Sequence, residues 1–66
     1  MNEYCNILKA LREEREFSQK EVADYLGTTQ QVYSRYEIGV NEIPVRQLIK
    51  LCKLYNVSAD YILGIK

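Results

Sequence analysis

Histidine is absent from the sequence, and cysteine occurs only twice, at Cys5 and Cys52. Structural zinc sites take their ligands mostly from these two residue types, so the chain has too few of them for such a site. The sequence leaves a disulfide between the two cysteines open, although without a secretion signal two reduced thiols acting as small apolar side chains are favoured. We therefore expect no metal and no other cofactor.

Long apolar runs are also missing: none approaches the roughly 20 residues that a membrane-spanning helix needs. No basic start followed by an apolar centre marks a signal peptide, so the cytoplasm is the expected location. Hydrophobic residues make up 47% of the chain and charged residues 27%, proportions typical of a globular protein. A chain of 66 residues is expected to form one domain, residues 1–66, with a small core.

Neither sign of charge is in excess, because nine Lys and Arg residues balance nine Asp and Glu residues. Non-specific nucleic-acid binding depends on neutralising phosphates, so this balance counts against it. It does not exclude a DNA-binding domain whose basic residues share one face. Catalytic patterns are missing too: there is no nucleophile–base pair, no glycine loop for a phosphate and no metal cluster. Glu13, Glu14 and Glu16 are interpreted as a solvated charge run, and we expect no enzyme.

The most informative stretch, residues 19–37, has the pattern of two short helices joined by a tight turn at Gly27. Ser18 and Glu21 have the spacing of a capping box, which predicts that the first of these helices begins at residue 19. Glycine at position 27 suits the left-handed conformation that often ends a helix. The sequence therefore predicts a helix over residues 19–26.

The second helix of this stretch is predicted from about residue 29 to residue 37, with Thr28 as its N-cap. On a helical wheel its apolar residues fall on one side: Val32, Tyr33 and Tyr36. The opposite side carries polar side chains: Gln30, Gln31, Ser34 and Arg35. A solvated helix face usually mixes Glu and Lys, whereas Gln and Arg form paired hydrogen bonds with the edges of bases. This face is the first indication of a nucleic-acid partner.

Apolar periodicity predicts three more helices and no strand, over residues 3–15, 45–55 and 59–63. The residues expected to begin or end these helices are Asn2, Pro44, Asn56, Ser58 and Gly64. Five short helices with short connections predict an all-α bundle. The predicted core is Val22, Ala23, Leu26, Tyr33, Tyr36, Leu48 and Leu51. The apolar arc of the fourth helix also contains Val45, Ile49, Cys52 and Tyr55, whereas Leu54 lies at its margin.

The spacing within residues 19–37 argues against an ordinary pair of packed helices. Counted from Gln19, Ala23 is fifth, Gly27 ninth, and Tyr33 and Tyr36 fifteenth and eighteenth. In these positions, and in the segments LKALREER, SQKEVADYLGTT, RYEIG and LIKLCKLYNVSADYILG, the sequence resembles the phage-repressor (Cro/CI, XRE-type) helix-turn-helix family. The resemblance covers about residues 7–63 and implies a five-helix, lambda-repressor-like DNA-binding domain.

The resemblance also implies base contacts in the major groove from one face of the third helix. Gln30 and Gln31 match positions that reach base edges, where a glutamine amide pairs with adenine. Ser34 and Arg35 follow one turn later, and Thr29 suits the methyl group of thymine. The alternative interpretation of the two glutamines is a solvated surface.

Phosphate contacts are implied for Gln19, Arg12 and Asn41. Gln19 begins a helix, where the helix dipole favours an anion. Arg12 and Glu37 match a salt-bridged pair that leaves the arginine near the DNA backbone, although a purely structural tie is the favoured role. Residues 38–43 depart from the family because this loop contains an acid, several apolar residues and no basic residue.

The expected function is sequence-specific binding of double-stranded DNA by a transcription regulator, such as a repressor or a Cro-like regulator of a mobile element. We expect a homodimer on its operator, with recognition helices one turn, about 34 Å, apart. Dimer contacts are expected at residues 61–65 and at Leu54. The alternative is a protein-interaction module, such as an antitoxin-like regulatory partner. Its contact surface would be Ile38, Val40 and Ile43.

Overall fold

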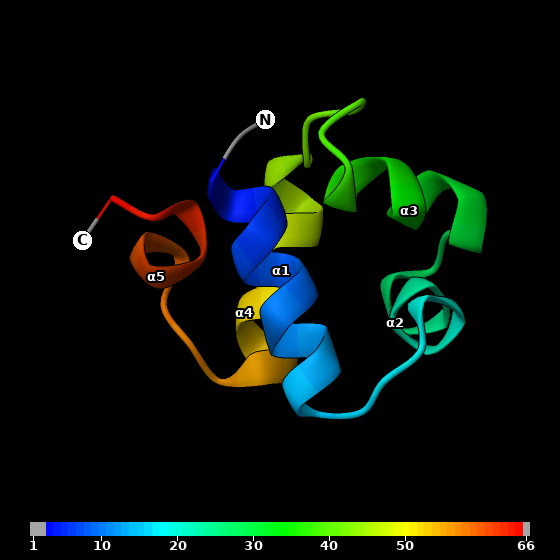
Figure 1. Cartoon of the computed structure of the whole chain (residues 1–66), viewed down its shortest axis with the longest axis horizontal. Helices are drawn as coiled ribbons and strands as arrows, with labels where there is room; N and C mark the ends of the chain where they lie inside the picture. Colours follow the sequence, from blue (N-terminus) through cyan, green and yellow to red (C-terminus); the bar gives the residue numbers. More distant parts are fainter. Residues whose placement is uncertain (1–2, 66) are drawn as a thin grey trace.

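The computed structural model describes residues 3–65 and contains five α-helices and no strand within that range. The helices are α1 (Glu3–Glu14), α2 (Gln19–Leu26), α3 (Gln30–Glu37), α4 (Val45–Tyr55) and α5 (Ala59–Leu63) (Figure 1). The expected all-α, five-helix class is confirmed. Between residues 3 and 65, no helix has the length and apolarity that crossing a membrane requires. The predicted cap Asn2 lies outside the described residues.

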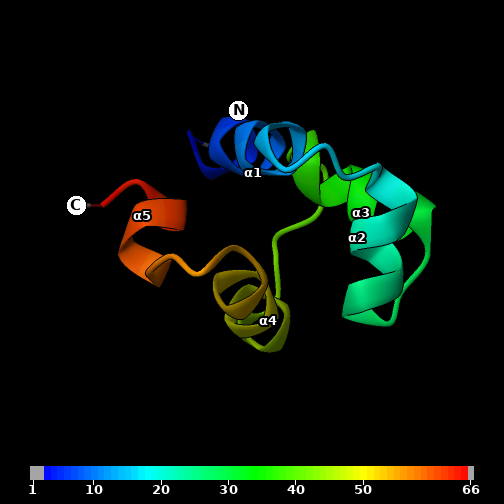
Figure 2. The same cartoon turned by 90° about the horizontal axis from the view of Figure 1, so that it is seen from below.

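Helix α1 is the central element of the molecule. In Figure 1 α2 and α3 lie on one side of it and α5 on the other, and Figure 2 shows α4 across from α1. Helices α2 and α3 contact each other closely, while α1 contacts both α3 and α5. The helix-turn-helix unit and α5 therefore occupy opposite ends of a molecule that measures 29 × 23 × 21 Å.

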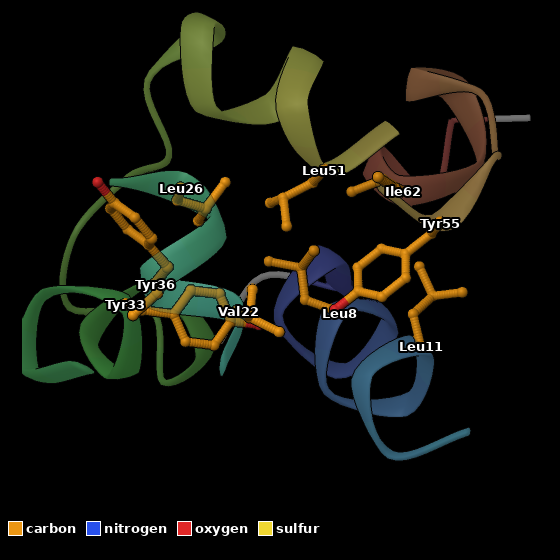
Figure 3. Packing of buried hydrophobic residues seen from close by; sticks show 10 residues of the cluster. Leu8, Leu11, Val22, Leu26, Tyr33, Tyr36, Leu51, Tyr55 and Ile62 are labelled. Atoms are coloured by element: carbon orange, nitrogen blue, oxygen red, sulfur yellow. The ribbon is translucent and has the colours of Figure 1, made fainter. Parts of the chain in front are cut away.

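The core lies where α1, α2, α3, α4 and α5 face one another. Its fully buried large side chains are Leu8, Val22, Leu26, Tyr33, Leu51, Tyr55 and Ile62. Figure 3 shows the rings of Tyr33 and Tyr55 among these aliphatic side chains. Of the predicted core residues, only Leu48 is partly rather than fully buried. Both cysteines are free thiols, and the buried Cys5 donates a hydrogen bond to the carbonyl of Tyr36 at 3.4 Å.

Predictions about burial were wrong at five residues. Val45 and Ile49 are 71% and 50% exposed, because no other helix covers the outer edge of the apolar arc of α4. Tyr25, which the sequence pattern of residues 19–26 groups with Val22, Ala23 and Leu26 on one side of the helix, is 46% exposed. Leu54 instead packs against the core. Ile62 is fully buried, so it contributes to the core and not to a dimer surface.

Helix α2 begins and ends as predicted. The Glu21 amide donates to Ser18 Oγ at 3.0 Å and the Ser18 amide to the Glu21 carboxylate at 2.7 Å, which completes the capping box. At the other end Gly27 has a φ of 75°, and its N–H is bonded to the carbonyls of Ala23 and Asp24. The short turn to α3 is therefore held by backbone geometry.

Helix α3 begins one residue later than predicted, and its N-cap is Thr29 rather than Thr28. The N–H of Thr28 donates to the carbonyl of Ala23 at 3.0 Å and so helps to close α2. The extended conformation that an N-cap needs falls on Thr29, whose hydroxyl accepts from the Val32 amide at 3.1 Å. Helix α1 also ends one residue early, at Glu14, because Glu16 adopts a φ of 58° and turns the chain.

Replacing Gly27 by alanine is expected to lower the free energy of unfolding by about 1 kcal/mol. A Cβ at this position would have no atom within 4 Å, so the loss isolates the strain of a positive φ. Gly27→Asn is the matched control and should lose less, since asparagine tolerates this conformation better. Urea unfolding followed by circular dichroism measures both variants. Equal stability of Gly27→Ala and the parent protein would contradict the assigned conformation.

Candidate nucleic-acid interface

The outer face of α3 lines a shallow surface groove. Gln30, Gln31 and Arg35 are exposed and Ser34 is half-buried, whereas Tyr33 and Tyr36 on the opposite face are buried. The groove has a volume of about 600 Å³, and it is lined by Gln19, Gln30, Gln31, Ser34, Arg35 and Ile38. The structure thus brings four of the five predicted base-contacting residues together with Gln19 from α2.

A second groove adjoins the first on the α1 side. It has a volume of about 320 Å³ and is lined by Asn6, Lys9, Arg12, Gln19, Glu37 and Ile38. Gln19 and Ile38 line both grooves, so the two form one continuous surface across α1, α2 and α3. Sequence reasoning missed the contributions of Asn6, Lys9 and Ile38 to this surface. Their spacing from Arg12 places the first two on the same side of α1. Only the packing of α1 against α3 shows that this side adjoins the groove of α3.

Arg12 and Glu37 form a two-point ion pair at the base of this surface. Arg12 Nε donates to Glu37 Oε2 at 2.7 Å, and Nη2 donates to Oε1 at 3.2 Å. The amide of Gln19 donates to the same Oε1 at 3.2 Å, and the hydroxyl of Tyr33 donates to Oε2. The third arm of the guanidinium donates to the carbonyl of Phe17 at 3.0 Å. One buried carboxylate therefore joins α1, α2 and α3.

The protonation states of this network follow from its donors. Burial alone would raise the pKa of Glu37, but the hydrogen bonds from Arg12, Tyr33 and Gln19 outweigh burial and hold that pKa below its ordinary value. The bond to Glu37 raises the pKa of Arg12. Burial, reinforced by the same carboxylate, raises the pKa of Tyr33 far above its ordinary value. At neutral pH the carboxylate is therefore charged, and the tyrosine stays a neutral donor.

The charges of the molecule are unevenly distributed. The two grooves are lined by Lys9, Arg12 and Arg35, against the single acid Glu37, which is three positive charges minus one, or +2. The whole chain has a formal charge of zero. The linings of the two grooves thus carry a small excess of positive charge, the sign that a DNA-binding surface needs, on a chain that is neutral as a whole.

A family model described as helix-turn-helix matches residues 8–62. The chain belongs to the XRE-type helix-turn-helix family. This confirms the resemblance that the sequence carries and places α2 and α3 as the helix-turn-helix unit of the family.

Three relatives from Bacillus subtilis are similar to most of the chain. The uncharacterized HTH-type transcriptional regulator YobD is 36% identical over 94% of this chain and 55% of its own length. The SPbeta prophage-derived regulator YonR is 43% identical over 85% of this chain and 52% of its own. The HTH-type transcriptional regulator ImmR is 40% identical over 86% of this chain and 45% of its own. The chain therefore spans about half the length of these relatives.

Two of the predicted contact residues of this helix-turn-helix domain lie outside both groove linings. Thr29 is exposed, but its hydroxyl is occupied by the Val32 amide, which leaves its methyl group for a partner. Asn41 is exposed in the loop after α3, and its backbone N–H donates to the carbonyl of Arg35 at 3.2 Å. The backbone of Asn41 is therefore held near the C-terminal end of α3.

The loop after α3 presents two apolar side chains to solvent. Ile38 is 56% exposed and Val40 is 66% exposed. Ile43 is only partly exposed and packs against the core, so it does not join them in the expected contact surface. Ile38, the C-cap of α3, lines both grooves.

Proposed function

We propose that residues 1–66 form a domain that binds double-stranded DNA sequence-specifically and acts in transcription regulation. The observation that carries the proposal is the single groove formed by Gln30, Gln31, Ser34 and Arg35 on the outer face of α3. Within residues 3–65, no hydrogen bond occupies the side chains of Gln30, Gln31 or Arg35, so their donors and acceptors remain free for base edges. The names of the relatives, all HTH-type transcriptional regulators, support the regulatory part.

In this proposal α3 enters the major groove with its N-terminal residues toward the bases. Gln30 and Gln31 pair with adenine N6 and N7, and Arg35 reaches a guanine or a phosphate. Ser34 lies between them, and the free methyl of Thr29 contacts a thymine. Arg12, Gln19 and Asn41 bind phosphates beside the groove, which sets the position of α3 on the duplex.

Gln30→Ala and Gln31→Ala are each expected to reduce discrimination at one base pair by about 5- to 100-fold and to leave the fold intact. The parent protein first selects sites from random duplex DNA at moderate salt, and each variant then repeats the selection. Lys53→Ala on the exposed side of α4 is the control and should select the parent site. If both glutamine variants still selected the parent site with unchanged affinity, α3 would not read bases through these residues.

We also propose that the domain binds its operator as a homodimer. The molecule measures 29 × 23 × 21 Å, so two copies placed side by side are long enough to span the roughly 34 Å between successive major grooves. The exposed apolar surface near α4 supplies a contact region. It surrounds a groove of about 230 Å³ lined by Tyr4, Glu42, Ile43, Val45, Leu48 and Leu63.

A protein-interaction module is the second candidate function, and the exposure of Ile38 and Val40 favours it. Salt dependence separates the two functions. Binding through several phosphates weakens steeply as salt rises, whereas contact through apolar side chains does not. Because Ile38 lines the same grooves as the polar residues of α3, a protein partner at this loop would compete with DNA.

A further inference from the structure

We propose that Asn6 and Lys9 on α1 bind a backbone phosphate of the DNA, so that α1 supplies the positively charged contact that the loop after α3 lacks. The inference rests on the proposed function, since it assumes that α3 occupies the major groove. Residues 38–43 contain Glu42 and no basic residue. The phosphates that flank α3 therefore need a cation from elsewhere in the fold.

The geometry of α1 provides that cation at the right place. Asn6, Lys9 and Arg12 follow one another at intervals of three and line one groove together. This groove shares Gln19 and Ile38 with the groove that α3 lines. Helix α1 contacts α3 (Figure 1). In the proposed complex, a duplex seated on α3 therefore passes one edge of its major groove across α1. The strand at that edge presents phosphates to Asn6 and Lys9.

Lys9 is the uncommitted positive charge of this groove. The guanidinium of Arg12 is held by Glu37 and by the carbonyl of Phe17, and Glu37 balances its charge. Between residues 3 and 65, Lys9 forms no ion pair, and its side chain is exposed. Lys20 on α2 is paired with Asp24 at 3.5 Å. A lysine binds phosphate as a flexible point charge, and the adjacent amide of Asn6 adds a neutral donor.

The test measures how affinity for the selected site depends on salt. Removing one phosphate contact lowers the steepness of log K against log salt by about 0.9, which is roughly an eightfold loss of affinity at 0.1 M salt. Lys9→Gln is expected to show this change equally on specific and on random DNA. Asn6→Asp, which places a carboxylate beside the phosphate, is expected to lose at least about tenfold.

Lys53→Gln is the matched control, because it changes the net charge by the same amount on an exposed position of α4 outside both grooves. It should keep the parent salt dependence. If the parent protein bound no DNA, the proposed function and this inference would fall together. If the parent bound DNA and Lys9→Gln matched Lys53→Gln in affinity and salt dependence, only the inference would be overturned. Circular dichroism and urea unfolding establish that each variant is folded.

Discussion

Glu37→Ala is expected to lower the free energy of unfolding by about 3–5 kcal/mol, the largest loss among single substitutions at polar positions. The side chain of Glu37 is 3% exposed and that of Arg12 is 13% exposed. The substitution removes the acceptor that three donors share: the guanidinium of Arg12, the buried hydroxyl of Tyr33 and the amide of Gln19. A domain of this size has only roughly 3–10 kcal/mol of stability in total, so the variant is expected to be partly unfolded at room temperature.

Two milder variants show which part of the network is responsible. Glu37→Gln keeps the side-chain volume and an acceptor but removes the charge. Its free energy of unfolding should therefore fall less than that of Glu37→Ala. Tyr33→Phe removes one donor and leaves the ion pair, with an expected loss of about 0.5–1.5 kcal/mol. Urea unfolding compares the four proteins. A loss below about 1 kcal/mol for Glu37→Ala would show that the pair behaves like a solvent-exposed salt bridge.

Lowering the pH should remove the contribution of the Glu37 carboxylate to stability. Because the pKa of folded Glu37 lies below its unfolded value, its contribution is complete above the unfolded pKa of about 4.3 and disappears as pH falls through the folded pKa. The parent protein is therefore expected to lose more stability than Glu37→Gln between about pH 6 and pH 3. The other carboxylates are common to both proteins, so the difference between the two pH curves isolates Glu37. Parallel curves would contradict the assigned pKa direction.

Helix ends were predictable wherever the signal lies within a few residues. Ser18 and Glu21 form their capping box, and Gly27 takes its left-handed conformation, because both depend only on local backbone geometry. The sequence offered two adjacent threonines as caps for α3, and local propensity does not separate them. Thr29 is the cap because the N–H of Thr28 donates to the carbonyl of Ala23 at the C-terminal end of α2.

Burial was less predictable because a helical wheel does not show how many neighbours a helix has. The wheel grouped Val45 and Ile49 with Leu51, but only Leu51 lies under other helices. Gln47, which the apolar pattern of the fourth helix does not include, is 5% exposed and donates to the carbonyl of Leu26 at 3.2 Å. A buried glutamine that binds the end of another helix depends on tertiary contacts, which sequence periodicity does not reveal. The same holds for Ile62, which contacts the core only because α5 folds back onto α1.

In the candidate site too, features within one helix were predictable, and features that depend on packing between helices were not. The polar face of α3 was predictable, because residues 30, 31, 34 and 35 share one side of a single helix. The hydroxyl of Tyr33 on Glu37 was also within reach of the sequence, since the two residues are four apart on α3. The contribution of Asn6 and Lys9 was not predicted, because it depends on where α1 lies against α3.

The largest effect on operator affinity is expected from Val45→Glu, a change outside both grooves of the DNA-facing surface. Val45 is 71% exposed at the first residue of α4, where an acidic side chain suits the helix dipole, so the isolated domain should stay folded. In the proposed dimer the new carboxylate would lie in the apolar groove between two copies. Operator affinity is expected to fall by at least about 100-fold, because separate copies lose the advantage of binding two linked half-sites. Affinity for an isolated half-site should be unchanged.

Sedimentation equilibrium and titration with full and half operators measure both effects. Tyr25→Glu is the matched control. Tyr25 is 46% exposed on α2, so this substitution adds the same charge outside the apolar groove. It should remain dimeric and keep the parent affinity. If Val45→Glu were as dimeric as the parent, the contact would lie elsewhere, and exposed Tyr61 would be the next position to test. If the parent bound full and half operators equally, the domain would act as a monomer.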